Sequence, residues 1–212
     1  MVEFKNVTVL SHPLISHKVA ILRDRNTGMK EFRENVEELA MLMGYESMRD
    51  LQTVPVQVET PIEVTTERKI PEGSVVIVPI LRAGLGMVNG IHNLFPNAKV
   101  GHIGVYRDEE TLSAHEYYCK LPDGIEDKIV YVLDAMLASG ACACESISIL
   151  KKRGCKNIKF MSIVASPEGV TRLAKTHPDV QIYLATLDEG INSSGYILPG
   201  LGDAGDRMFG TK

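Results

Sequence analysis

The chain lacks the features typical of membrane proteins, secreted proteins and nucleic-acid-binding proteins. It has no window of about 18 apolar residues, and its N-terminal stretch MVEFKNVTVLSHPLISHK has no signal-peptide pattern. Its net charge is −4, whereas non-specific nucleic-acid binding depends on a basic surface. Its four cysteines contain no C-x-x-C pair, which is the spacing of zinc and redox sites. We therefore expect a cytoplasmic protein with reduced thiols, no metal cluster, no membrane or nucleic-acid contact, and a small-molecule partner.

Five short apolar segments indicate a single α/β domain spanning residues 1–212. Most of them are nearly continuous, as expected for strands buried on both faces of a parallel sheet. The regions between them have helical spacing, and this alternation is typical of a doubly wound, mostly parallel sheet. The five expected strands are residues 75–80, 100–106, 129–133, 158–165 and 180–187.

Three regions lie outside this repeat. A long amphipathic helix is expected before the sheet, ending near Gly44. Residues 106–128 are too long and too polar for a simple connection, and their tyrosine pair and LPDG turn favour a projecting hairpin, or β-arm. The C-terminal residues 191–212 are rich in glycine. The apolar stripe of the expected helix is Phe32, Val36, Leu39, Ala40 and Met43.

The loop after the first expected strand reads PILRAGLGM. Its Arg82 is followed by Gly84 and Gly86. Glycines let a backbone approach an anion closely, and a guanidinium binds phosphate oxygens through a planar fork, so the loop suits a diphosphate. The alternative is a strand-to-helix turn that uses its glycines only for packing.

The third expected strand ends in an acid, Asp134, and the following ASGAC turns into a helix. Free N–H groups and the helix dipole at such a turn favour a phosphate. A carboxylate a few residues earlier can reach the hydroxyls of a ribose whose 5′-phosphate lies in that turn. The alternative makes Asp134 an ordinary turn residue and the small residues mere helix packing.

The tail GYILPGLGDAGDRMFGT carries two further acids, Asp203 and Asp206. Its glycine-dense backbone offers donors and acceptors for the edge of a flat heterocycle. The apolar YILP and MF are expected to anchor the tail to the domain, against the alternative of a loose terminus. A hydrolase site built from Asp134 and Asp203 would leave both glycine-rich loops without a role.

Together these motifs resemble the uracil phosphoribosyltransferases, a family of the type I phosphoribosyltransferase superfamily. The resemblance rests on VPILRAGLGM, GVYRDEETL, YYCKLP, LDAMLASG, PEGVTRLAKTHPDV and GYILPGLGDAGDRMFGTK, in this order. It runs from about HPLISHKVAILRD to the C-terminus. The tail motif is specific to that family, whereas the Asp134 segment is shared in outline across the superfamily.

The resemblance implies a reaction and an assembly. Uracil and 5-phosphoribosyl 1-diphosphate would give UMP and diphosphate, with Mg²⁺ bound mainly through the diphosphate of the donor. The fold would be a doubly wound sheet with a β-arm at about 106–128 and a C-terminal base-binding hood at about 191–212. A homo-oligomer, dimer or tetramer, is also implied. GTP activates some relatives, and the sequence leaves open whether it activates this chain.

The resemblance further implies a role for each loop. Arg82 would hold the diphosphate, Arg107 would close over it, and these two with Asp134 and Asp203 are the expected catalytic residues. Asp203 is also the candidate for orienting or accepting the proton of uracil N1. The expected donor-binding residues are Arg82, Arg107, Asp134, Ala135, Met136, Leu137, Ala138, Ser139, Gly140, Ala141, Cys142 and Asp203. The expected uracil-binding residues are Ile197, Gly202, Asp203 and Ala204.

The phosphate turn departs from the family pattern. Family members usually carry proline after the strand-end aspartate and a Thr-Gly-Gly-Ser/Thr turn, where this chain has Ala135 and Ser139-Gly140-Ala141-Cys142. If position 141 needs a positive φ, alanine costs about 1 to 2 kcal/mol there. A thiol in place of a hydroxyl donor to phosphate forfeits about 1.5 to 3 kcal/mol. We therefore expect an active enzyme with a raised KM for the donor, which an Ala141→Gly/Cys142→Ser double change should lower.

Two other functions remain open from the sequence. The first is a catalytically weakened relative that senses uracil nucleotides and regulates another process, as the RNA-binding pyrimidine attenuator proteins of this fold do; the acidic composition argues against RNA. The second is a phosphoribosyltransferase for a purine, which would need a base pocket different from YILPGLGDAGD.

Overall fold

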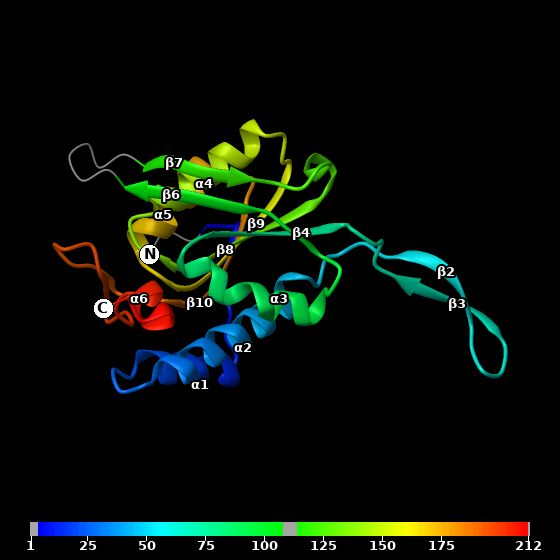
Figure 1. The fold of residues 1–212 in the computed structure, drawn as a ribbon, viewed down its shortest axis with the longest axis horizontal. Coiled ribbons are helices and arrows are strands. Elements are labelled where there is room, and N and C mark those ends of the chain that lie inside the picture. The colour runs from blue at the N-terminus through cyan, green and yellow to red at the C-terminus, as the bar shows by residue number, and fades with distance from the viewer. Residues whose placement is uncertain (1–3, 108–113, 212) are drawn as a thin grey trace.

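The central element of the fold is a twisted, mostly parallel sheet (Figure 1). The structure, a computed structural model, describes residues 4–107 and 114–211. Within these residues eight strands join the sheet in the order β1-β10-β9-β8-β4-β6-β7, with β5 also pairing with β4. Only β7 runs antiparallel to its neighbour among these pairs. The strands are β1 (Val7–Val9), β4 (Val75–Leu81), β5 (Lys99–Val100), β6 (His102–Arg107), β7 (Ala114–Lys120), β8 (Ile129–Leu137), β9 (Asn157–Ala165) and β10 (Gln181–Leu187).

Helices cover both faces of the sheet and divide the core into two layers. Successive side chains of β4 point to opposite faces, so Val76 and Val78 join one buried cluster and Val75 and Ile77 join the other. This arrangement confirms the doubly wound α/β fold that the sequence predicts. One layer contains α4 (Ala141–Lys152) and α5 (Pro167–Thr176), and the other contains α1 (Pro13–Arg23), α2 (Met29–Ser47), α3 (Val88–Leu94) and α6 (Ala204–Phe209).

The expected strands are confirmed, with one interruption. The second segment is split into β5 and β6 at Gly101, whose N–H donates to the carbonyl of Ile77 at 2.9 Å. A Cβ on Gly101 would lie 2.8 Å from the side chain of Leu121, so a glycine is needed for this close approach. The short edge strand β1 has no counterpart among the predicted strands.

The predicted apolar stripe of α2 is buried, but the helix does not end at Gly44. All five stripe residues are at most 1% exposed, and α2 continues to Ser47. A Cβ on Gly44 would lie 2.7 Å from Cδ1 of Ile91 in α3. Gly44 therefore permits close packing of two helices, and the end of α2 lies at Ser47, near the predicted position.

One hairpin that projects from the domain was not predicted from the sequence. In the region of the expected β-arm, β6 and β7 pair antiparallel, and β6 also pairs with β4 of the central sheet; residues 108–113 of the expected arm lie outside the described part. The hairpin that extends from the body is formed by β2 (Val54–Glu59) and β3 (Val64–Lys69) (Figure 1). The alternating valines of VPVQVE were the signal for this hairpin.

The C-terminal segment is anchored to the domain. It contains the short hairpin β11 (Gly190–Ile191) and β12 (Ile197–Leu198), followed by α6. Ile197 and Met208 are buried in the same cluster as α1 and α2. The expectation of an anchored tail is therefore confirmed. No helix in the described part of the chain is long and apolar enough to span a bilayer.

Candidate active site

The loop that follows β4 packs tightly between β8 and α6. It begins with a cis peptide bond between Leu81 and Arg82 and continues as the short 3-10 helix η1 (Ala83–Met87). A Cβ on Gly84 would lie 2.2 Å from the carbonyl oxygen of Leu133, and one on Gly86 would lie 2.3 Å from the sulfur of Met208. Both glycines are therefore required for packing, whatever else the loop binds.

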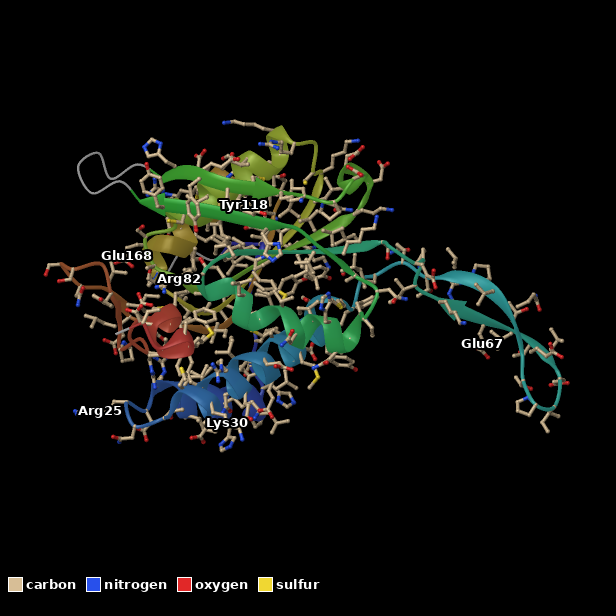
Figure 2. The ribbon with its side chains drawn as sticks, viewed as in Figure 1. Arg25, Lys30, Glu67, Arg82, Tyr118 and Glu168 are labelled. Atoms are coloured by element: carbon tan, nitrogen blue, oxygen red, sulfur yellow. The ribbon has the colours of Figure 1, made fainter. Side chains whose placement is uncertain are left out.

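Arg82 extends from this loop toward the C-terminal segment (Figure 2). Its Nη1 donates to the hydroxyl of Thr211 at 3.0 Å, and its Nη2 donates to Oδ1 of Asp206 at 3.1 Å. The side chain of Arg82 is half exposed. The guanidinium thus lies at the carboxyl end of the sheet with solvent access, which is where an anionic ligand would reach it.

Asp134 lies inside β8, which continues to Leu137, whereas the sequence predicted that Asp134 is at the end of the strand. It is paired opposite Ser162 of β9, whereas the pairing of β8 with β4 ends at Leu133 opposite Pro79. Asp134 is therefore the first residue of β8 beyond its pairing with β4. Burial raises the pKa of Asp134 to about 7, against the opposing effect of hydrogen bonds from the main-chain N–H groups of Met136 and Ala135.

The turn after β8 forms a small cavity at the N-terminus of α4. Gly140 caps the helix with φ of +74°, and a Cβ there would lie 2.9 Å from the carbonyl oxygen of Gly169. Free main-chain N–H groups of the first turn and the helix dipole both favour an anion at this end. The cavity has a volume of about 130 Å³ and is lined by Asp134, Met136, Leu137, Ala138, Ser139, Gly140, Ala141, Cys142 and Ala143.

Position 141 does not need a positive φ, so the expected strain of alanine is absent. Ala141 is the first residue of α4 and is 5% exposed, and the left-handed position is Gly140. Alanine suits a helix, so the energy cost that the sequence analysis attached to a positive φ at position 141 does not apply. Cys142 lies in the first turn of α4 and packs partly against the core, which leaves its thiol as the remaining departure at the phosphate turn.

The predicted donor residues of β8 alternate between the site and the core. Ala135 and Leu137 are each 1% exposed and belong to the two core layers, so their side chains cannot contact a ligand. Met136, which lies between them, and Ala138, which follows Leu137, line the cavity described above. Only main-chain atoms of Ala135 and Leu137 remain available to a donor.

A second cavity, of about 290 Å³, adjoins the first. Met136 and Ala138 line both, and Gly202 and Asp203 of the C-terminal segment close the second one. Ile197 and Ala204, which the sequence analysis also assigned to uracil, are buried at 3% and 1% exposure and offer only main-chain groups. Three further residues of this lining were not predicted from the sequence, although Tyr196, next to Ile197, has an aromatic ring of the kind that often lines a ligand site. They are Ser194, Gly195 and Tyr196.

Asp203 both faces this cavity and starts α6. Its Oδ1 accepts a hydrogen bond from the N–H of Asp206 at 2.8 Å, which is the usual arrangement of an aspartate at a helix N-cap. The cap holds the Asp203 carboxylate in one orientation. The loop that carries Gly202 and Asp203 therefore presents its polar groups from a fixed position.

A buried ion pair supports this loop, and the sequence analysis did not identify it. The Asp188 side chain is 2% exposed and accepts from both Nη atoms of Arg23 in α1. Its Oδ2 also accepts from the N–H of Gly200 at 2.8 Å, while Nη1 of Arg23 donates to the carbonyl of Gly200 at 2.8 Å. The hydrogen bond to Asp188 and the negative charge of Asp188 raise the pKa of Arg23, against the opposing effect of burial, so Arg23 stays charged and holds the loop against α1.

Arg107 is the last residue of β6, and its side chain lies outside the described structure. The strand brings its backbone to the same carboxyl edge as Arg82, because β6 is parallel to β4. The role expected for Arg107 therefore stays a prediction.

A divalent cation would have to arrive with a ligand. In residues 4–107 and 114–211, no group of three or more His, Cys, Asp or Glu side chains is arranged to hold a metal. The carboxylates of Asp134 and Asp203 line adjoining cavities, and carboxylate oxygens suit Mg²⁺. The residues present therefore fit a Mg²⁺ ion that is carried largely by a phosphate ligand.

Comparison with known proteins places this site in a family. The sequence model described as uracil phosphoribosyltransferase matches residues 9–211. A uracil phosphoribosyltransferase of Thermoanaerobacter sp. (strain X514) is 56% identical over 209 residues, covering 99% of this chain and 100% of that one. A uracil phosphoribosyltransferase of Clostridium acetobutylicum is 57% identical over 206 residues, covering 97% and 99%.

A solved structure agrees in fold over the same extent. The AQ2163 protein of Aquifex aeolicus superposes with a TM-score of 0.93 at 39% sequence identity, covering 97% of this chain and 99% of that one. The phosphate turn, the Arg82 loop and the C-terminal loop thus occur in a chain that matches its relatives from end to end. The chain belongs to the uracil phosphoribosyltransferase family.

Proposed function

We propose that this chain transfers the 5-phosphoribosyl group from 5-phosphoribosyl 1-diphosphate to uracil, giving UMP and diphosphate in pyrimidine salvage. The observation that carries the proposal is the pair of adjoining cavities that share Met136 and Ala138. One cavity lies at a helix N-terminus suited to a phosphate, and the other lies beneath a glycine-rich loop suited to a flat base. Family membership supports the same reaction.

The chemistry requires the site to stabilise a leaving anion. Cleavage of the bond between C1 of ribose and the diphosphate places negative charge on the diphosphate, which we assign to Arg82 and Arg107. Asp134, as a carboxylate, accepts hydrogen bonds from the ribose hydroxyls, and main-chain N–H groups of residues 139–142 hold the 5′-phosphate. Mg²⁺ bound with the donor supplies further neutralisation of the diphosphate charge.

Asp203 is the residue that we assign to the proton of uracil N1. Its Oδ1 is engaged by the N–H of Asp206, so Oδ2 is the atom assigned to orient or accept that proton. The main-chain groups of Ile197, Gly202 and Ala204 are assigned to the uracil edge. Because Asp203 faces the cavity lined by Met136 and Ala138, the donor and the base meet beside it.

The proposal is tested by UMP formation from labelled uracil over a range of donor concentrations with Mg²⁺. Saturable turnover with uracil, and little with guanine or hypoxanthine, is the expected result. Failure of the folded protein to form UMP at any donor concentration, with and without GTP, would contradict the proposal and favour a uracil-nucleotide sensor. Turnover with guanine instead of uracil would indicate a purine enzyme.

Cys142→Ser is expected to lower the KM for the donor by about three- to tenfold, because a hydroxyl donates to a phosphate better than a thiol. Ala141→Gly is not expected to lower it, because Ala141 is helical, and glycine at this position removes helix propensity. Steady-state kinetics of the two single variants checks this. A lower KM in Ala141→Gly, or an unchanged KM in Cys142→Ser, would show that this account of the phosphate turn is wrong.

We also propose a homo-oligomer, and two surfaces support it. The projecting hairpin exposes Ile62 at 90% and Val64 at 64%, and β7 exposes Tyr117 and Tyr118. Apolar side chains that extend this far from the domain are typical of a contact between proteins. Light scattering on the purified protein tests the proposal.

Activation by GTP rests on the resemblance alone, and the UMP assay with and without GTP tests it.

A further inference from the structure

The candidate site contains a carboxylate to which the family resemblance gave no role, Asp206. It lies in the first turn of α6, and its side chain is 17% exposed, whereas that of Arg82 is 50% exposed. Its Oδ1 accepts from Nη2 of Arg82 at 3.1 Å. Figure 2 shows Arg82 at the junction between the β4 loop and α6. An ion pair in this position links the C-terminal segment directly to the loop that we assign to the diphosphate.

Thr211 completes this arrangement from the other side of the guanidinium. Its hydroxyl accepts from Nη1 of Arg82 at 3.0 Å and donates in turn to Oδ1 of Asp206. The two acceptors are therefore neighbours, and together they use one N–H from each Nη atom. A guanidinium has five N–H donors, so about three remain for a ligand.

The backbone of α6 packs closely against the β4 loop beside this ion pair. A Cβ on Gly205 would lie 3.4 Å from Nη2 of Arg82, and Gly86 of the β4 loop lies directly against Met208. Gly205 and Met208 both belong to α6. The β4 loop and α6 are therefore in contact at the Arg82 guanidinium and at Gly86.

An arginine side chain has several rotatable bonds, and fixing it costs up to about 2 kcal/mol of conformational entropy. Asp206 and Thr211 fix the Arg82 guanidinium before any ligand is present. A donor that meets an oriented guanidinium does not bear this cost on binding. The same helix begins at Asp203, so the orientation of Arg82 also depends on the position of the base-binding loop.

We propose that Asp206, assisted by Thr211, is a positioning residue that holds the Arg82 guanidinium in the orientation that binds the diphosphate. The proposal rests on the proposed function, since it names a further residue of the same site. Asp206 acts through Arg82 and does not itself contact the donor.

The test compares Asp206→Ala with Asp206→Asn, which keeps an Oδ1 acceptor for Arg82. Binding of Mg²⁺-pyrophosphate and of the donor is measured at equilibrium, and the KM values for donor and uracil are measured separately. Asp206→Ala is expected to weaken both binding reactions about tenfold, and Asp206→Asn less than threefold. Neither substitution removes the helix cap, because Asp203 binds the main-chain N–H of residue 206. Asp179→Ala, which removes an exposed carboxylate paired with Lys151, is the matched control and should leave binding unchanged.

A double-mutant cycle separates positioning from a general structural role. In an Arg82→Ala background, Asp206→Ala should weaken pyrophosphate binding by less than twofold, because its target is gone. An equal weakening in both backgrounds, or tighter binding in Asp206→Ala, would overturn the proposal. Pyrophosphate binding does not depend on UMP formation, so a wild-type protein without turnover would refute the proposed function and leave this result interpretable.

Discussion

Replacing Asp134 with asparagine is expected to stabilise the folded protein at pH 8 by about 1 to 3 kcal/mol. Burial raises the pKa of Asp134 from 3.8 to about 7, so between these pH values the folded state binds more protons than the unfolded state. Stability from this group therefore falls as the pH rises through that window. Asparagine carries no charge and still offers an oxygen to the N–H of Met136.

Thermal or urea unfolding at pH 5 and pH 8 measures this effect. The gain of Asp134→Asn should be larger at pH 8 than at pH 5. Asp179→Asn is the control of opposite sign, because the hydrogen bond from Lys151 lowers the pKa of Asp179. It should give no gain at pH 8. A loss of stability in Asp134→Asn at pH 8 would show that Asp134 is not a destabilising charge in the ligand-free protein.

The same substitution is expected to impair activity. A carboxylate that accepts hydrogen bonds from ribose hydroxyls contributes about 1.5 to 3 kcal/mol, so kcat/KM for the donor should fall about ten- to a hundredfold. In the wild type, kcat/KM for the donor should rise with pH through about 7, as Asp134 ionises in the free protein. Asp134→Asn should lack this rise. A variant that is more stable and less active would identify Asp134 as a carboxylate kept for function.

Arg82→Ala is expected to lower kcat/KM for the donor about a hundred- to a thousandfold, while the KM for uracil changes little. Arg82 offers the leaving diphosphate several oriented N–H donors, and removal of such donors weakens transition-state stabilisation by this order. Arg82→Lys should recover only part of the loss, because an ammonium group lacks the planar fork. Steady-state kinetics with donor and uracil varied in turn measures both effects.

The control for Arg82→Ala is Arg153→Ala, which removes a guanidinium at the far end of α4. Arg153 is about half exposed and pairs with Glu116 of β7, away from both cavities. Its loss should leave kcat/KM within a factor of about two, as expected for an exposed ion pair. A loss in Arg82→Ala no larger than this control would contradict the assignment of the diphosphate to Arg82.

The fold was predictable where burial leaves a periodic pattern. The runs that became β4, β8 and β9 are continuous because both faces of these strands are covered by helices. The stripe of α2 repeats every three and four residues because one side of the helix faces the core. Two features did not follow from such a pattern. Gly44 has the usual signature of a helix end but serves close packing, and β2–β3 has no buried face to emphasise its pattern.

The candidate site was predictable as a set of loops but not as a set of contacting atoms. Asp134, Gly202 and Asp203 were found because acids and glycines stand out in loops after apolar runs. The burial of Ala135 and Leu137 depends on the continuation of β8 to Leu137, and this end of the strand could not be located from the sequence. The position of the positive φ, at Gly140 and not at position 141, likewise depended on where α4 begins.

The sequence by itself determined the doubly wound fold, the family resemblance and the three loops that we propose as substrate-binding loops, because each of these depends on residues that are close together in the chain. Only the tertiary structure decided which distant residues meet. Arg23 binds Asp188 across 165 positions, and Arg82 binds Asp206 across 124. Arginine and aspartate are common in loops, so nothing local marks such pairs. Chain topology brings them together at the carboxyl end of the sheet, where the charged partners form hydrogen bonds.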